Sequence, residues 1–263
     1  MNRNEIIVIK VGTSTLTYDN GKMNLRLFDS LCKVISDLQN AGNKVILVSS
    51  GAIGVGVGKL GLKERPDSTS QRQALAAVGQ CELMFMYDKI FGDYNTLVAQ
   101  ILLTADDVDE AIKRKNVENT FKELLKLNII PIVNENDTVA TTELEGKVFG
   151  DNDSLSAIVA CVAKADRLII LTDTNGFYTA NPKINKDAKR IPKVEIIDDY
   201  IMSLAGDSMS NRGTGGTITK IKAAKIATEN GIETCIINGD EPTNLYKILE
   251  KEDIGTVFLK NKI

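Results

Sequence analysis

Short runs of apolar, β-branched residues alternate along the chain with longer segments in which apolar residues recur at helical spacing. The apolar runs lie at residues 6–11, 44–49, 96–102, 129–133, 167–172, 233–237 and 256–259. The helical patterns lie near residues 24–40, 70–91, 110–127, 152–164 and 217–230. Because strands this apolar need cover on both faces, the alternation predicts an α/β fold: a three-layer αβα sandwich around an open, mostly parallel sheet.

Polar residues follow four of the predicted strands. The strands end in KVGTS (10–14), SSGAIG (49–54), NEND (134–137) and TDTNG (172–176). Each could be an ordinary turn. Since ligands gather at the carboxyl ends of parallel strands, four such ends together predict one polar site at this edge of the sheet.

Two lysines are candidates for holding a phosphate. Lys10 lies in an apolar strand, where a charge is costly without an anionic partner; the alternative is an edge-strand lysine that reaches water. Lys220 follows the glycine-rich stretch 206–216, which runs into a predicted helix. Backbone amides of such a loop and the helix N-terminus both favour anions.

Two other strand ends suit an amino-acid zwitterion. Residues 49–51 open a helix, and their amides and hydroxyls suit a small anion such as a carboxylate. Asn134 and Asn136 can donate and accept hydrogen bonds, and Asp137 can pair with an ammonium group. The cluster at 150–153 (GDND) could be only a helix N-cap. The preceding stretch 143–149 indicates a hairpin or a flexible loop.

Composition removes several classes of function. The chain of 263 residues has no histidine, which excludes Ser-His-Asp and Cys-His hydrolases and histidine-ligated zinc sites. The net charge of −3 gives no basic excess for nucleic acid. No apolar run approaches the roughly 20 residues of a membrane span, and no signal peptide is evident. The four cysteines form no C-x-x-C pair. We therefore expect a cytoplasmic protein with no nucleic-acid or membrane partner.

The stretch GVGKLG at residues 56–61 formally matches G-x-G-x-x-G. In a dinucleotide-binding fold this motif forms the turn between strand and helix. Here the strand has already ended at Ser49, so we interpret these glycines as a flexible or close-packed start of a helix. A nicotinamide oxidoreductase remains the alternative that this motif would support.

Six motifs, in this order, resemble the glutamate 5-kinases, a branch of the amino acid kinase family. They are KVGTS (10–14), SSGAI (49–53), PIVNENDTV (131–139), GDNDSLS (150–156), LTDTNGFY (171–178) and the stretch 205–220 that ends in GTGGTITK. The resemblance covers nearly the whole chain, and NEND together with GTGG is typical of this branch. It implies the amino acid kinase fold with about eight strands, in one domain over 1–263 without a C-terminal PUA domain.

The resemblance also implies a function and assigns the two substrates to different halves of the chain. ATP would phosphorylate the γ-carboxylate of L-glutamate, the first step of proline synthesis. Residues 1–165 would bind glutamate and 166–263 would bind ATP. Lys10, Lys220 and Asp153 would be catalytic, with Asp153 orienting both ammonium groups. The glutamate site would comprise Ser50, Gly51, Ala52, Asn134, Asp137 and Asn152. The ATP site would comprise Lys10, Thr172, Asp173, Thr214, Gly215, Gly216, Thr217, Ile218, Thr219 and Lys220.

The resemblance further implies Mg²⁺ carried by ATP, with no metal ligand assigned in the protein. It implies a homo-oligomer, proline as a feedback inhibitor, and coupling to glutamate-5-semialdehyde dehydrogenase. Acetylglutamate kinase, carbamate kinase and a non-catalytic amino-acid sensor with the same fold are the remaining alternatives. A sensor would not need Lys10, Asp153 and Lys220 together.

Overall fold

Side chains of the central strands alternate between two hydrophobic cores, one on each face of a single sheet. The computed structural model describes residues 4–18, 22–140, 151–206 and 216–261. In strand β1 (Ile6–Val11), Ile7 and Ile9 pack into one core and Val8 into the other, all fully buried. Because neighbouring side chains of a strand point to opposite faces, such a continuously apolar strand needs cover on both sides.

The described residues form an eight-stranded sheet in the order β3-β4-β2-β1-β5-β7-β8-β6. After β1 the strands are β2 (Lys44–Ser49), β3 (Val98–Leu103), β4 (Ile130–Glu135), β5 (Arg167–Thr172), β6 (Lys193–Val194), β7 (Glu233–Asn238) and β8 (Thr256–Phe258). Every neighbouring pair is parallel except β7 and β8, which run antiparallel. The predicted mostly parallel sheet is confirmed.

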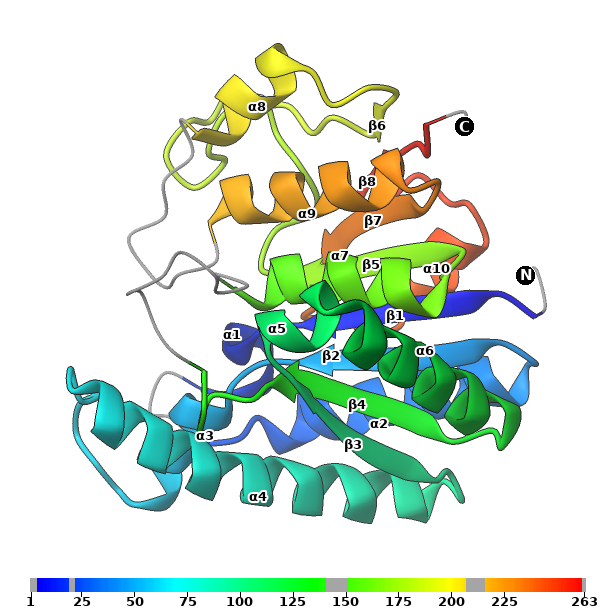
Figure 1. The fold of residues 1–263 in the computed structure, drawn as a ribbon. Helices are drawn as coiled ribbons and strands as arrows, with labels where there is room; N and C mark the ends of the chain where they lie inside the picture. Colours follow the sequence, from blue (N-terminus) through cyan, green and yellow to red (C-terminus); the bar gives the residue numbers. More distant parts are fainter. Residues whose placement is uncertain (1–3, 19–21, 141–150, 207–215, 262–263) are drawn as a thin grey trace.

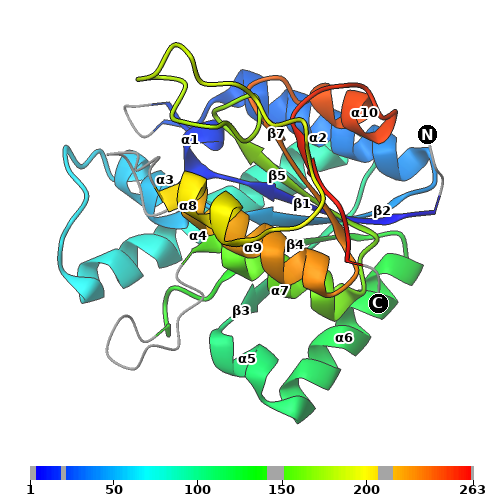
Figure 2. The same cartoon turned by 90° about the horizontal axis from the view of Figure 1, so that it is seen from above.

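Ten helices of the described segments cover both faces of this sheet. They are α1 (Thr13–Leu16), α2 (Leu25–Asn40), α3 (Ala52–Lys59), α4 (Thr69–Asp93), α5 (Ala105–Asp109), α6 (Ala111–Lys126), α7 (Asn152–Ala163), α8 (Asp199–Gly206), α9 (Thr217–Glu229) and α10 (Asn244–Leu249). Helices α1, α2, α3, α4 and α10 contribute to one core, and α5 to α9 contribute to the other. Figure 1 shows α6, α7 and α9 in front of the sheet, and Figure 2 shows α2 and α10 on its far side. The predicted three layers are confirmed.

The start of one strand differs from the prediction by two residues, for a local reason. The run 96–102 is observed as β3 at Val98–Leu103, so the predicted start is two residues too early. Asn95 has a left-handed φ of +54°, and the Thr96 amide donates to the Phe91 carbonyl at 2.9 Å. Thr96 therefore belongs to the C-terminal cap of α4.

The short elements α1, α5, α8, α10 and β6 were absent from the prediction. They contain two to eight residues each, which is too short to display a clear hydrophobic repeat. The predicted hairpin at 143–149 lies outside the described residues. No helix within the described ranges combines the length and apolar character that crossing a bilayer would require.

Helices α3 and α4 touch through their backbones. A Cβ atom added to Gly79 of α4 would overlap the carbonyl oxygen of Ala52 and crowd the amide nitrogen of Gly56. A Cβ atom added to Gly56 of α3 would overlap the carbonyl oxygen of Leu75. Gly56 is thus a close-packed residue of α3, whereas Gly61 lies beyond the end of the helix with open space around it. The stretch 56–61 forms no turn directly after a strand, as predicted. This contact fixes the first turn of α3 against α4.

Replacement of Gly79 by alanine should separate the two helices and destabilise the fold. We expect Gly79→Ala to lower the free energy of unfolding by about 3 kcal/mol or more, because the new methyl group has no space. Gly92→Ala is the matched control, since Gly92 lies on the same helix with no atom within 4 Å of an added Cβ. That change should leave stability unchanged or raise it by up to about 1 kcal/mol through helix propensity. Urea denaturation of both variants tests this, and equal effects would contradict it.

Candidate active site

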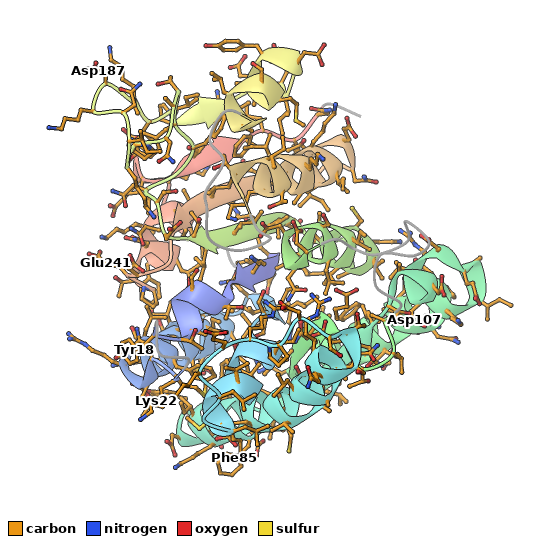
Figure 3. All side chains as sticks on the ribbon, turned by 90° about the vertical axis from the view of Figure 1, so that its left-hand side faces the viewer. Tyr18, Lys22, Phe85, Asp107, Asp187 and Glu241 are labelled. Atoms are coloured by element: carbon orange, nitrogen blue, oxygen red, sulfur yellow. The ribbon has the colours of Figure 1, made fainter. Side chains whose placement is uncertain are left out.

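The carboxyl ends of four neighbouring strands meet the N-termini of two helices. Strands β4, β2, β1 and β5 are adjacent and parallel, so their polar ends lie at one edge of the sheet. Helix α7 follows β4 in the chain and α9 precedes β7. Figure 3 looks onto this edge, with Tyr18 and Glu241 towards one side and Asp107 towards the other. Strand β2 lies on one side of β1 and β5 lies on the other, so the strand order reverses at β1. The carboxyl end of β1 is therefore a topological switch point.

Three charged side chains meet at this edge. Lys10 Nζ lies 2.6 Å from Oδ1 of Asp153, and Lys220 Nζ lies 3.1 Å from Oδ2. The Asp153 side chain is fully buried, and those of Lys10 and Lys220 are 8% and 12% exposed. Because β1 is central and Lys10 is buried, the alternative of an edge-strand lysine in water is wrong. The structure brings the three predicted catalytic residues together.

The surroundings keep Asp153 ionised. Burial opposes the charged form, but Lys10 and Lys220, with a hydrogen bond from Thr219, hold the pKa of Asp153 below its ordinary value. The Thr219 hydroxyl lies 2.8 Å from Oδ2 of Asp153. Asp153 is in the first turn of α7, where the helix dipole also favours an anion. The adjacent Asp151 is the N-cap and accepts from the Ser154 amide at 2.8 Å, so capping and ion pairing belong to different residues of this cluster.

An amide network joins α7 to the ends of β2 and β4. Nδ2 of Asn152 lies 3.0 Å from the Ser49 carbonyl, 2.9 Å from the Ser50 hydroxyl and 2.9 Å from Oδ1 of Asn134. Nδ2 of Asn134 in turn donates to Oε1 of Gln80 at 2.9 Å. Three residues of the predicted glutamate site are therefore in direct contact, and Gln80 of α4 joins them.

The start of α3 completes this side of the site. Gly51 is the N-cap of α3, with a left-handed φ of +103° that a larger residue would adopt only under strain. A Cβ atom on Gly51 would approach the side chain of Thr13. Ala52 begins the helix, as predicted, so the amides of its first turn are available to an anion.

A pocket lies beside Asn134. It is lined by Ala52, Ala76, Gln80, Leu102, Glu135, Asn136, Asp137 and Thr138. Burial, together with Asp137 and Asp151, raises the pKa of Glu135 to about 7. Burial also raises the pKa of Asp137, an effect that Arg65 partly opposes. The pocket thus places the Glu135 carboxyl group next to Asp137 and Ala52 of the predicted glutamate site.

The predicted ATP residues lie at β5 and α9. Thr172 ends β5, and its hydroxyl lies 3.3 Å from Oδ1 of Asp173. Burial opposes ionisation of Asp173, but Lys183 lies close enough to hold its pKa below the ordinary value. Gly216 is the N-cap of α9, and Thr217, Ile218, Thr219 and Lys220 form the first turn of that helix. Thr214 and Gly215 lie outside the described residues.

The sequence prediction missed three residues of this region: Gln80, Glu135 and Lys183. Gln80 lies in a long helix without a periodic polar signal, and its partner Asn134 is 54 residues away. Lys183 lies in a polar connection between β5 and β6, where one lysine does not stand out from its neighbours. Glu135 is part of the NEND motif, so its position was visible although its raised pKa was not. Among the described residues, no group of three or more acidic or cysteine side chains is arranged to hold a metal ion.

Solved structures share this architecture at low sequence identity. The chain superposes on the UMP kinase from Ureaplasma parvum with a TM-score of 0.66 and 16% identity, covering 98% of this chain and 100% of that one. A carbamate kinase from Giardia lamblia bound to AMP-PNP gives a TM-score of 0.67 and 15% identity, covering 98% and 99%. Likeness at this level of identity shows the fold alone.

Sequence relatives are much closer. A model of the amino acid kinase family matches residues 5–238. The glutamate 5-kinase of Clostridium perfringens is 53% identical over 257 residues, covering 97% of this chain and 96% of that protein. The glutamate 5-kinase of Enterococcus faecalis is 50% identical, covering 97% and 94%, and that of Listeria monocytogenes is 51% identical, covering 97% and 93%. The chain therefore belongs to the amino acid kinase family and, within it, to the glutamate 5-kinases.

Proposed function

We propose that this protein uses ATP to phosphorylate the γ-carboxylate of L-glutamate, giving L-glutamyl 5-phosphate as the first step of proline biosynthesis. The observation that carries the proposal is the buried Asp153 carboxylate between the ammonium groups of Lys10 and Lys220. Two cations held at one point suit the transfer of a phosphoryl group between two anions. The identity of about 50% to glutamate 5-kinases over 97% of the chain supports the choice of acceptor.

The chemistry needs no histidine. A carboxylate is already ionised at neutral pH, so it attacks the γ-phosphorus of ATP without a general base. A carboxylate oxygen forms the new bond to phosphorus, and the bond from phosphorus to the bridging oxygen breaks, releasing ADP. The obstacle is repulsion between the carboxylate and the triphosphate. Lys10 and Lys220 would neutralise the transferring group, and Asp153 would hold both ammonium groups in position.

The two substrates would occupy the two halves of the single domain at 1–263. Residues up to about 165 would bind glutamate through Ser50, Gly51, Ala52, Asn134, Asp137 and Asn152. Residues from about 166 would bind ATP through Thr172, Asp173 and the stretch 214–220, with Lys10 reaching across from β1. The amide network and the start of α3 support the first assignment, and the N-terminus of α9 supports the second.

Mg²⁺ would enter with ATP and supply charge neutralisation to the phosphate oxygens. The residues at the edge of the sheet fit this group. Two lysines and two helix N-termini favour a polyphosphate, and a hard cation would neutralise the charge of the polyphosphate that remains. Among the described residues Asp153 is already held by two lysines, so we assign the protein no metal ligand.

The proposal extends to regulation and partners. Proline carries the same α-ammonium and α-carboxylate arrangement as glutamate, so it would inhibit by occupying the glutamate site. An acyl phosphate is labile, which favours rapid use of the product by a coupled glutamate-5-semialdehyde dehydrogenase. We further propose a homo-oligomer in the cytoplasm, where the four free cysteines would remain reduced.

Removal of either lysine should stop the reaction. We expect Lys10→Ala and Lys220→Ala each to lower kcat by about 10²–10³-fold, because each removes a preorganised charge from the transition state. The assay contains glutamate, ATP, Mg²⁺ and hydroxylamine, and it measures the hydroxamate that traps the acyl phosphate. Lys222→Ala, on the exposed side of α9, is the matched control and should keep normal turnover. Circular dichroism checks the fold, and near-normal kcat in both lysine variants would overturn the mechanism.

Asp137 should act on glutamate binding alone. Asp137→Asn removes the negative charge proposed for the α-ammonium group at nearly constant volume. We expect the KM for glutamate to rise by about 10–100-fold, the value of a hydrogen bond to a charged group, with the KM for ATP unchanged. Asp109→Asn, at an exposed aspartate of α5, is the control. An effect confined to ATP would refute this role of Asp137.

Glu135 should make stability depend on pH. Its pKa is raised from 4.5 to about 7 in the folded protein, so between these values the folded state holds a proton that the unfolded state releases. The free energy of unfolding therefore falls as pH rises through this window. Glu135→Gln stays neutral and should be more stable than the unmodified protein at pH 8, by on the order of 1 kcal/mol because Glu135 is partly exposed.

The gain from Glu135→Gln should shrink at pH 5, where most of Glu135 is protonated in the folded state. Urea denaturation of both proteins at the two pH values measures the difference. An equal difference at both values would mean that the Glu135 carboxyl does not titrate as proposed.

A further inference from the structure

Three side-chain amides form a continuous chain from α7 to α4. Asn152 donates to Oδ1 of Asn134 at 2.9 Å, and Nδ2 of Asn134 donates to Oε1 of Gln80 at 2.9 Å. The three residues come from α7, β4 and α4, which are far apart in sequence. Gln80 is the last member of this chain, and it also lines the pocket that contains Asp137.

Two backbone groups fix which way each amide points. The Ser49 carbonyl can only accept, so the group of Asn152 that faces it at 3.0 Å must be Nδ2. The Glu135 amide can only donate, so the atom of Asn134 that faces it at 2.9 Å must be Oδ1. Asn134 must then present Nδ2 to Gln80, and Gln80 must present Oε1 to Asn134. The orientation of Gln80 thus follows from the backbone.

This orientation leaves the Nε2 group of Gln80 available. Within the described part of the chain, the hydrogen bond of the Gln80 amide is the one that Oε1 accepts. The ionisable groups that line the pocket are the carboxyl groups of Glu135 and Asp137, which would repel a carboxylate when ionised. An α-carboxylate entering this pocket needs donors, and Nε2 of Gln80 can supply one or two N–H groups alongside the side-chain amide of Asn136, which lines the same pocket.

We propose that Gln80 binds the α-carboxylate of the amino-acid substrate through Nε2 and is a specificity-determining residue. This inference rests on the proposed function. Asn152 is next to Asp153, so the amide chain leads away from the lysines towards Gln80. The reacting γ-carboxylate belongs at the lysine end, and the α-carboxylate at the Gln80 end. Asp137, in the same pocket, faces the α-ammonium group.

The substitution Gln80→Glu separates this role from a structural one. A glutamate at this position keeps an acceptor for Nδ2 of Asn134 but replaces the donor with a carboxylate. We expect the KM for glutamate to rise by about 10–100-fold, with the KM for ATP unchanged. The inhibition constant of 4-aminobutyrate, which is glutamate without its α-carboxylate, should not rise. The hydroxamate assay measures all three quantities.

Gln71→Glu is the matched control, since it makes the same atomic exchange at an exposed position of the same helix. It should leave the KM for glutamate unchanged. Gln80→Met removes the amide without adding charge, and it should also raise this KM if the charged variant fails to fold. Thermal denaturation checks the fold of each variant.

Two outcomes would overturn the role of Gln80. One is a KM for glutamate within about twofold of the unmodified protein in Gln80→Glu. The other is an inhibition constant of 4-aminobutyrate that rises as much as the KM for glutamate. If the unmodified protein formed no hydroxamate, the proposed function would fail instead. Calorimetric titration of glutamate into both proteins would then still decide whether Gln80 contributes to binding.

Discussion

The buried carboxylate of Asp153 is the constraint on which the rest of the site depends. A fully buried carboxylate is tolerated only when cations and hydrogen-bond donors compensate for its lost hydration. Lys10 and Lys220 supply the charges, and they come from the central strand β1 and the first turn of α9. The ion pairs therefore fix one strand and two helix N-termini relative to one another. The folded protein holds both cations in place before any substrate binds, which reduces the reorganisation needed during the reaction.

Helix α4 supports the site from outside the charged centre. Gly79 allows its backbone to touch the first turn of α3, and Gln80 holds the side chain of Asn134. Farther along the same helix, the hydroxyl of the fully buried Tyr87 lies 2.9 Å from the Ser49 hydroxyl at the end of β2. Burial raises the pKa of Tyr87, so this hydroxyl stays protonated and can donate. One helix thus positions α3, β2 and β4, which are three of the elements proposed to bind glutamate.

The sequence carried enough information to predict the fold and the charged centre, but not the contacts through which α4 supports the site. Apolar strands with polar ends indicate a parallel sheet and the edge at which ligands bind. Lys10 stands out because its charge interrupts such a strand. Gln80 and Tyr87 give no comparable signal, because one amide and one tyrosine in a helix of mixed polar and apolar residues do not stand out from their neighbours. Their roles depend on contacts across 54 and 38 residues, which only the folded chain reveals. Lys183 also gives no signal in the sequence, because its link to the site is an ion pair with Asp173 that the folded chain brings together.

The fold does not determine which acceptor is phosphorylated. The solved structures of a UMP kinase and a carbamate kinase share this fold with the chain at 15–16% identity. A parallel sheet that brings cations to its carboxyl edge can bind the phosphate that is transferred, and every kinase transfers such a group from its donor to its acceptor. The acceptor must then be distinguished by groups farther from the transferred phosphate. In this chain we propose Gln80, Asn134 and Asp137 for this role, and the backbone-fixed orientation of the amides would let these residues distinguish a carboxylate from an ammonium group.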